Sequence, residues 1–207
     1  AGMKCRYSLM KAYVLSPKEL AEEAKMLADC GLDEITIMDS AGTMMPHETE
    51  AYTKELVAAV DIPVAFHGHN NLGLSVANAI AAAEAGATVF DCGLLGMARS
   101  AGNCATELLV ATFQRLGYFK DIDLYKLLAF LDGELIPAME EYNYHVAVKP
   151  FDLILGLAGC HSSFTKRFQN IADEMGVPLY QLIVEVSKRD QKAPSEELIR
   201  QIAADLV

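Results

Sequence analysis

An α/β fold is predicted for residues 1–120 because short apolar runs alternate with longer segments of helical spacing. The runs are rich in Ile, Val, Phe and Tyr and end in glycine or polar residues, which is typical of buried strands. They cover 5–10, 34–38, 63–66 and 88–92. Their starts recur about every 25 to 30 residues, the length of a strand, a crossover helix and the return to a parallel neighbour. We therefore expect four β-α units.

The segments between the runs carry the start and stop signals of helices. Ser16, Pro17 and Glu19 favour a helix start, because the serine hydroxyl and the glutamate can satisfy free backbone donors reciprocally. Gly31 and Gly86 favour helix ends. The expected helices cover 17–30, 46–60, 75–85 and 104–116.

The strand signal fades after residue 120, and helical spacing dominates the rest of the chain. Pro150 is expected as a hinge within this part. The expected helices cover 124–142, 162–176, 180–188 and 195–207.

Four β-α units suit either a doubly wound open sheet or one half of a (β/α)8 TIM barrel. Neither a G-x-G-x-x-G fingerprint nor a Walker loop supports a nucleotide-binding open sheet. In both folds the loops that leave the carboxyl ends of the strands form one face, where ligands bind.

The composition argues against several classes of protein. The chain has 17 Lys+Arg against 28 Asp+Glu, a formal charge of −11, and 52% hydrophobic residues. The acidic balance argues against a nucleic-acid partner, and the apolar content argues against disorder. No apolar stretch reaches the roughly 20 residues of a bilayer crossing, and no secretory signal is visible. The five cysteines form no C-x-x-C pair, so we interpret them as free thiols and expect a cytoplasmic protein without a membrane partner.

A pair of histidines at the end of the third predicted strand is a candidate metal site. His67 and His69 are two residues apart, so both rings project to one side, and Gly68 leaves the approach open. The alternative is that both rings only bond to loop carbonyls. A divalent ion also needs oxygen ligands, and Asp39 and Asn103 are the nearest donors by topology. Each has an alternative role in capping a turn or a helix.

Four motifs carry a resemblance to a known family. They are I-M-D-S-A-G-T-M, F-H-G-H-N-N-L-G-L-S-V-A-N-A-I, G-M-A-R-S-A-G-N-C-A-T-E and A-G-C-H-S-S-F, at residues 37–44, 66–80, 96–107 and 158–164. Together they resemble the pyruvate aldolase branch of the HMG-CoA lyase-like, metal-dependent TIM-barrel family. The resemblance covers nearly the whole chain, and the histidine motif is its most specific part.

The resemblance implies a (β/α)8 barrel in which His67 and His69 bind a divalent ion, manganese first, with magnesium or cobalt as alternatives. Asn103 is implied as a further ligand, and Ser40, His67 and His161 as groups that contact the substrate. The implied reaction is the cleavage of 4-hydroxy-2-oxo acids, such as 4-hydroxy-2-oxovalerate, to pyruvate and an aldehyde during aromatic hydrocarbon catabolism. The metal would stabilise the pyruvate enolate.

The sequence departs from the family pattern in two places. The family has an arginine, an aspartate and a histidine in an R-D-G-x-x-H motif on its first strand, and this motif is absent here. By resemblance the chain therefore begins at the fifth strand, as the second half of the barrel (residues 1–120) followed by an α-helical region (121–207). His161 occupies the position of a family tyrosine, which would alter substrate choice or pH dependence. Its alternative role is packing at the junction of the two regions.

Several alternatives stay open. Arg99 could neutralise a substrate carboxylate or simply lie on the surface. The chain could belong to an acyl-CoA lyase or an acetyl-CoA condensing synthase of the same superfamily, or it could be an inactive half-barrel or assembly subunit. The resemblance implies an acetaldehyde dehydrogenase partner. Open sheet edges favour a homo-oligomer or pairing with a missing N-terminal half.

Overall fold

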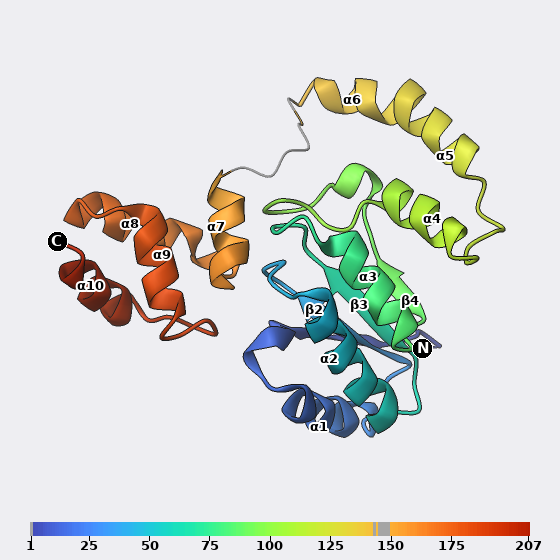
Figure 1. Ribbon diagram of the computed structural model, residues 1–207, viewed down its shortest axis with the longest axis horizontal. Coiled ribbons are helices and arrows are strands. Elements are labelled where there is room, and N and C mark those ends of the chain that lie inside the picture. Colours follow the sequence, from blue (N-terminus) through green and yellow to red (C-terminus); the bar gives the residue numbers. More distant parts are fainter. Residues whose placement is uncertain (1, 143, 145–149) are drawn as a thin grey trace.

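The computed structural model describes residues 2–142, 144 and 150–207. Its first part is a parallel four-stranded sheet in the order β1-β2-β3-β4, with one helix after each strand (Figure 1). The strands are β1 (Arg6–Met10), β2 (Glu34–Asp39), β3 (Val64–Gly68) and β4 (Val89–Asp91). The helices are α1 (Pro17–Ala28), α2 (Pro46–Ala59), α3 (Ser75–Glu84) and α4 (Thr106–Arg115). The four predicted β-α units are confirmed.

The strand order and the helix contacts agree with half of a barrel. Each strand pairs with the next strand along the chain, so the order contains no reversal of the kind that defines a doubly wound sheet. Successive helices also contact one another, α1 with α2, α2 with α3 and α3 with α4. All four helices therefore cover one face of the sheet, as they do on the outside of a barrel.

The predicted capping signal starts α1 as expected. The Ser16 hydroxyl accepts a hydrogen bond from the Glu19 N–H, and the Glu19 carboxylate accepts one from the Ser16 N–H. The last predicted helix of the sheet region starts two residues later than expected, at Thr106. The reason is that Cys104 and Ala105 pair with strand ends, Cys104 with Gly68 and Ala105 with Gly93.

Alternation along the strands gives the sheet two different faces. Leu9, Ile35, Ile37 and Phe66 point toward the helices and form the core with them. The opposite face carries His67, whose register partners are Met38 on β2 and Asp91 on β4. The register thus places one predicted site residue on the open face, near the carboxyl ends of the strands.

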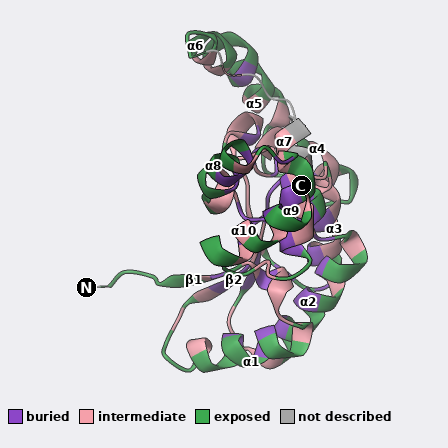
Figure 2. Ribbon diagram, turned by 90° about the vertical axis from the view of Figure 1, so that its left-hand side faces the viewer, coloured by how far each residue is buried: buried purple, intermediate pink, exposed green. Residues whose placement is uncertain are grey.

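The chain after α4 is helical, as predicted. The segment 124–140 consists of α5 (Leu124–Phe130), a π-helical turn (Leu131–Leu135) and α6 (Ile136–Glu140). Neither α5 nor α6 contains a buried residue, and Figure 2 shows α6 as mostly exposed.

The last four helices share a second hydrophobic core. They are α7 (Pro150–Ala158), α8 (Thr165–Met175), α9 (Leu179–Ser187) and α10 (Glu196–Asp205). Leu155, Phe168, Leu182 and Ile199 are at the centre of this core. Helix α7 was not predicted, and Pro150, expected as a hinge, is its first residue, a position that proline favours. No described helix is long and apolar enough to cross a membrane.

Helix α7 packs closely on the loop that follows β3, which we call the histidine loop (residues 69–74). A Cβ atom added at Gly156 would lie 2.6 Å from Cβ of Asn71 and 3.2 Å from Cγ of Leu72. A second contact joins the two regions, because the Lys11 ammonium donates to the Lys192 carbonyl. The helical region therefore supports one of the loops at the carboxyl ends of the strands.

The close approach at Gly156 predicts a stability difference between two glycine substitutions. Gly156→Ala should lower the free energy of unfolding by about 1 to 3 kcal/mol, because the added methyl group forces α7 away from Asn71. Gly133→Ala is the matched control, since a Cβ there meets nothing within 4 Å and the residue lies in a helical turn. Urea unfolding of both variants measures the difference, and equal stabilities would contradict the close packing.

Candidate metal centre

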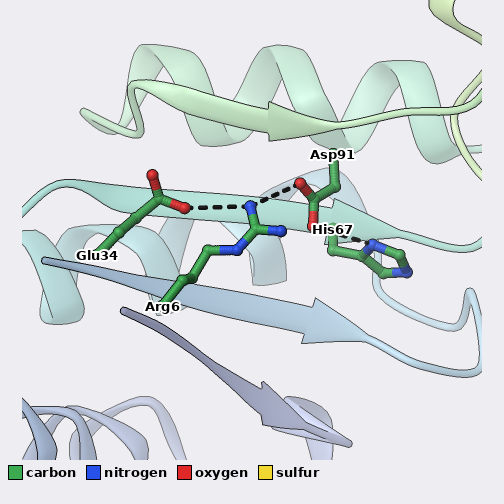
Figure 3. Close-up of polar contacts among 4 residues, drawn as sticks. All are labelled: Arg6, Glu34, His67 and Asp91. Atoms are coloured by element: carbon green, nitrogen blue, oxygen red, sulfur yellow. Dashed lines mark hydrogen bonds and ion pairs between the residues drawn. The ribbon is translucent and has the colours of Figure 1, made fainter. Parts of the chain in front are cut away.

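His67 is oriented by a carboxylate on the neighbouring strand. Its Nδ1 atom lies 3.4 Å from Oδ2 of Asp91 (Figure 3). Because a carboxylate accepts hydrogen bonds, this contact favours the ring form with its proton on Nδ1 and a lone pair on Nε2. A carboxylate behind a histidine is the usual support of a metal ligand. Sequence reasoning missed Asp91, although a charged residue within a strand, on the same face as His67, was a usable signal.

His69 is buried in its neutral form. Its side chain is largely enclosed, and burial lowers the pKa of the ring to about 4, with smaller contributions from His67 and Arg99. A hydrogen bond to the Arg99 backbone opposes this pKa shift. The Nδ1 atom is buried without a hydrogen-bond partner. A neutral imidazole with a free lone pair is the form that binds metal ions.

The two rings are arranged as neighbouring ligands of one ion would be. Their centres are 5.4 Å apart, and their planes are inclined by 66°. A cation about 2.1 Å from each ligating nitrogen places two ring centres about 5 Å apart. The separation therefore fits the predicted pair His67 and His69.

Asn103 supplies an oxygen beside this pair. It forms an antiparallel bridge with His69, and its Oδ1 atom is buried without a partner. It does not cap α4, whose N-cap is Ala105. Buried polar atoms normally have hydrogen-bond partners. Other described residues, such as Tyr13 and Thr36, also have a buried side-chain atom without one, but His69 and Asn103 are paired by the bridge and both atoms can bind a metal. They fit a shared cation.

Asp39 caps a turn, which was the expected alternative to metal binding. Its carboxylate accepts hydrogen bonds from the N–H groups of Thr43 and Met44, both at 3.0 Å. Burial raises the pKa of this carboxyl to about 6, and the backbone hydrogen bonds oppose the rise. Its main-chain carbonyl accepts from the His69 N–H at 3.2 Å. Asp39 thus orders the loop that follows β2, the serine loop (residues 40–45), and positions the histidine loop.

Ser40 and His161 are both buried near the strand ends. The Ser40 hydroxyl accepts from the Lys11 N–H at 2.9 Å. The His161 Nδ1 accepts from the Ser163 N–H at 3.2 Å, so a neutral ring carries its proton on Nε2. Burial lowers the pKa of His161, and the positive charges of Lys11 and Arg99 lower it further.

Arg99 is exposed and lies in the loop between β4 and α4, which we call the asparagine loop (residues 92–105). Its backbone bonds to His69, and its charge acts on both His69 and His161. These interactions bring Arg99 and His161 to the same end of the sheet as the histidine pair. No group of three or more His, Cys, Asp or Glu side chains that could hold a metal lies within the described part of the chain. The candidate centre is therefore two imidazoles and one amide oxygen.

The comparisons with known proteins identify the family to which the chain belongs. Residues 1–132 match the family profile described as HMGL-like, and the chain belongs to this family. Residues 146–207 match a second profile, described as a DmpG-like communication domain.

Curated relatives include a 4-hydroxy-2-oxovalerate aldolase of Carboxydothermus hydrogenoformans, 36% identical over 99% of this chain and 60% of its own length. Another, with the same name, comes from Pectobacterium atrosepticum and is 39% identical over 96% of this chain and 57% of its own length. The chain thus spans less than two thirds of the length of these relatives.

Solved structures show the same fold at low identity. The carboxyl transferase domain of Rhizobium etli pyruvate carboxylase with 3-hydroxypyruvate gives a TM-score of 0.73 at 17% identity, over 99% of this chain and 38% of that one. The HMG-CoA lyase of Brucella melitensis gives 0.59 at 24% identity, over 68% of this chain and 53% of that one. These matches and the family confirm the predicted α/β fold of the barrel type.

The contact between the serine loop and the histidine loop predicts the effect of a second glycine pair. Gly42 has φ +61°, and a Cβ there would lie 2.6 Å from the His69 carbonyl oxygen and 2.7 Å from the Asn71 nitrogen. Gly42→Ala should therefore displace the histidine loop and weaken divalent-metal binding at least about 10-fold.

Gly73→Ala is the control for this variant, because Gly73 has φ +72° and its Cβ would meet nothing within 4 Å. It carries the same backbone strain, about 1 kcal/mol, without the clash. Calorimetric titration with Mn²⁺ measures both affinities. Equal affinities in the two variants would show that the close approach does not position the ligands.

The buried neutral state of His69 predicts a dependence of stability on pH. The pKa of about 4 in the folded chain lies below the ordinary histidine pKa of about 6.5, so the unfolded chain binds more protons between these values. The neutral His69 ring contributes up to about 3 kcal/mol to the free energy of unfolding. This contribution is complete above about pH 6.5 and is lost as the pH falls toward 4.

Urea unfolding at pH 7 and pH 5 tests this dependence by comparing the parent chain with His69→Gln. The parent should lose more stability on acidification than the variant, since only the parent must charge a buried ring. His47→Gln, at an exposed position, should follow the parent. The prediction fails if His69→Gln loses as much stability as the parent.

Proposed function

We propose that this chain carries the metal-binding part of a divalent-metal-dependent aldolase that cleaves 4-hydroxy-2-oxo acids, such as 4-hydroxy-2-oxovalerate, to pyruvate and an aldehyde. The observation that carries the proposal is the unsatisfied pair of ligand atoms, His69 Nδ1 and Asn103 Oδ1, beside the oriented ring of His67. The name of the curated relatives, 4-hydroxy-2-oxovalerate aldolase, supports the substrate class and the aldolase reaction.

His67, His69 and Asn103 would hold the cation. When bound, a divalent cation supplies Lewis-acid stabilisation of the negative charge that develops on the pyruvate oxygens as the carbon–carbon bond breaks. The family resemblance favours manganese, with magnesium or cobalt as alternatives, and an oxygen ligand such as the Asn103 amide suits Mn²⁺ and Mg²⁺. The small number of protein ligands leaves positions for the substrate and for groups outside the described residues.

The substrate would lie between the strand ends and the first residues after α7. The His161 ring, held at Nδ1 by the Ser163 N–H, offers Nε2–H as a hydrogen-bond donor to a substrate oxygen. The Ser40 hydroxyl, which accepts from Lys11, keeps its own proton for a second hydrogen bond. Arg99 adds positive charge for a substrate carboxylate.

We also propose an aldehyde-accepting dehydrogenase as the partner of the helical region. The support is the match of residues 146–207 to the DmpG-like communication domain and the contact of α7 with the histidine loop. A partner bound to these helices would lie close to the point where the aldehyde is released.

Metal titration tests the ligand assignment. The parent chain should bind one Mn²⁺, and His67→Ala and His69→Ala should each weaken binding at least about 100-fold, because each removes a ligand. Asn103→Ala should weaken it about 10-fold. His47→Ala, at an exposed position on α2, is the matched control and should bind like the parent.

Ligand binding to the manganese-loaded chain tests the reaction class. Oxalate, which has the two adjacent oxygens of pyruvate, should bind, whereas acetyl-CoA should not. Binding of acetyl-CoA in preference to oxalate would instead favour an acyl-CoA lyase or a condensing synthase. A parent chain that binds no Mn²⁺ would contradict the proposal and favour an assembly role without catalysis.

A further inference from the structure

Arg6 reaches across the open face of the sheet to a residue on the far edge. It lies at the start of β1, and its Nη1 atom is 2.8 Å from Oδ1 of Asp91 at the end of β4. The same nitrogen is 3.1 Å from Oε1 of Glu34 on β2 (Figure 3). The first and last strands are not neighbours, so this contact depends on the curvature of the whole sheet.

The two oxygens of Asp91 have different partners. Oδ1 accepts from Arg6, and Oδ2 lies 3.4 Å from Nδ1 of His67. The contact to His67 is long and would be weak alone, whereas the contact to the guanidinium is short. The orientation of the carboxylate is therefore set mainly by Arg6.

We propose that Arg6 is a positioning residue of the metal centre: it holds Asp91 so that the carboxylate keeps His67 in the Nδ1–H form with Nε2 free. This inference rests on the proposed function for the role of His67 as a ligand. It adds a residue from the opposite edge of the sheet, which no motif singled out.

The exposure of Arg6, Asp91 and His67 indicates what the network does. The side chain of Arg6 is 42% exposed and that of Asp91 is 25% exposed, so solvent screens their attraction, and such pairs add little to stability. The His67 side chain is only 14% exposed. A partly exposed arginine thus controls a nearly buried ring, and its effect is on orientation more than on folding.

Nitrogen NMR of the histidine rings tests the orientation without any metal. The His67 signal is identified as the one that disappears in His67→Ala. In the metal-free parent chain at pH 8, this signal should show the proton on Nδ1. Arg6→Gln should increase the share of the Nε2–H form, because the carboxylate loses its short contact. Arg6→Lys should retain most of the Nδ1–H form, since an ammonium still offers a donor to Asp91.

Arg200→Gln is the matched control for a lost ion pair. Arg200 makes two contacts with Glu174, at 3.0 and 2.8 Å, in the last four helices. The His67 signal should not change in this variant. An unchanged signal in Arg6→Gln as well would overturn the proposal.

A double-mutant cycle on Mn²⁺ affinity tests whether Arg6 acts through Asp91. We expect Arg6→Gln to weaken binding about 5- to 10-fold and Asp91→Asn about 10- to 100-fold. The double variant should bind no more weakly than Asp91→Asn alone. Losses that multiply would show that Arg6 acts independently of Asp91, which overturns the proposal.

The two measurements separate this inference from the proposed function. If the parent chain binds no Mn²⁺, the metal assignment fails, while the ring signal still shows whether Arg6 orients His67. If Mn²⁺ binds and the ring signal is the same in Arg6→Gln and the parent, the metal assignment stands and Arg6 has no positioning role. Urea unfolding of Arg6→Gln confirms that the variant is folded.

Discussion

The candidate site depends on backbone hydrogen bonds that join three successive strand ends. The Asp39 carbonyl accepts from the His69 N–H, and the Gly68 carbonyl accepts from the Cys104 N–H. The Gly102 carbonyl accepts from the Asn70 N–H. The first bond continues the parallel pairing of β2 with β3, and the other two flank the antiparallel bridge between His69 and Asn103. They bring the serine, histidine and asparagine loops together before any side chain contributes.

The close approach of these loops accounts for the unsatisfied polar atoms. Backbone pairing of His69 with Asn103 encloses the ring of His69 and the amide oxygen of Asn103, so water is largely excluded from Nδ1 of the ring and from this oxygen. An enclosed imidazole is costly to protonate, which is why the pKa of His69 is low. The chain thus carries unsatisfied ligand atoms and a neutral ring, and a bound cation would compensate for both.

The helical region is attached to the site and is not simply an appended domain. Helix α7 contacts the histidine loop through Gly156, and the turn after this helix places His161 close enough to His69 for its protonation to lower the pKa of His69. Lys11, which follows β1, links the serine loop to the helical region. Its N–H donates to the Ser40 hydroxyl, and its ammonium donates to the Lys192 carbonyl. A displacement of the helices would therefore act directly on groups assigned here to ligand and substrate contacts.

The sequence by itself determined the order of strands and helices and the histidine pair, because periodicity, caps and short-range spacing are local properties. It also located Ser40, Asn103 and His161 through motif resemblance, although their roles remain proposals. It did not predict α7, whose residues are almost all apolar.

Only the tertiary structure decided which oxygen atoms are available at the site. Asp39 and Asn103 were equal candidates in the sequence, but backbone amides bind the carboxylate of Asp39, whereas the amide oxygen of Asn103 is left unsatisfied. The contact of Arg6 with Asp91 could not be predicted from the sequence either, since it joins residues 85 positions apart. Such contacts depend on sheet curvature and loop closure, which arise from packing of the whole chain.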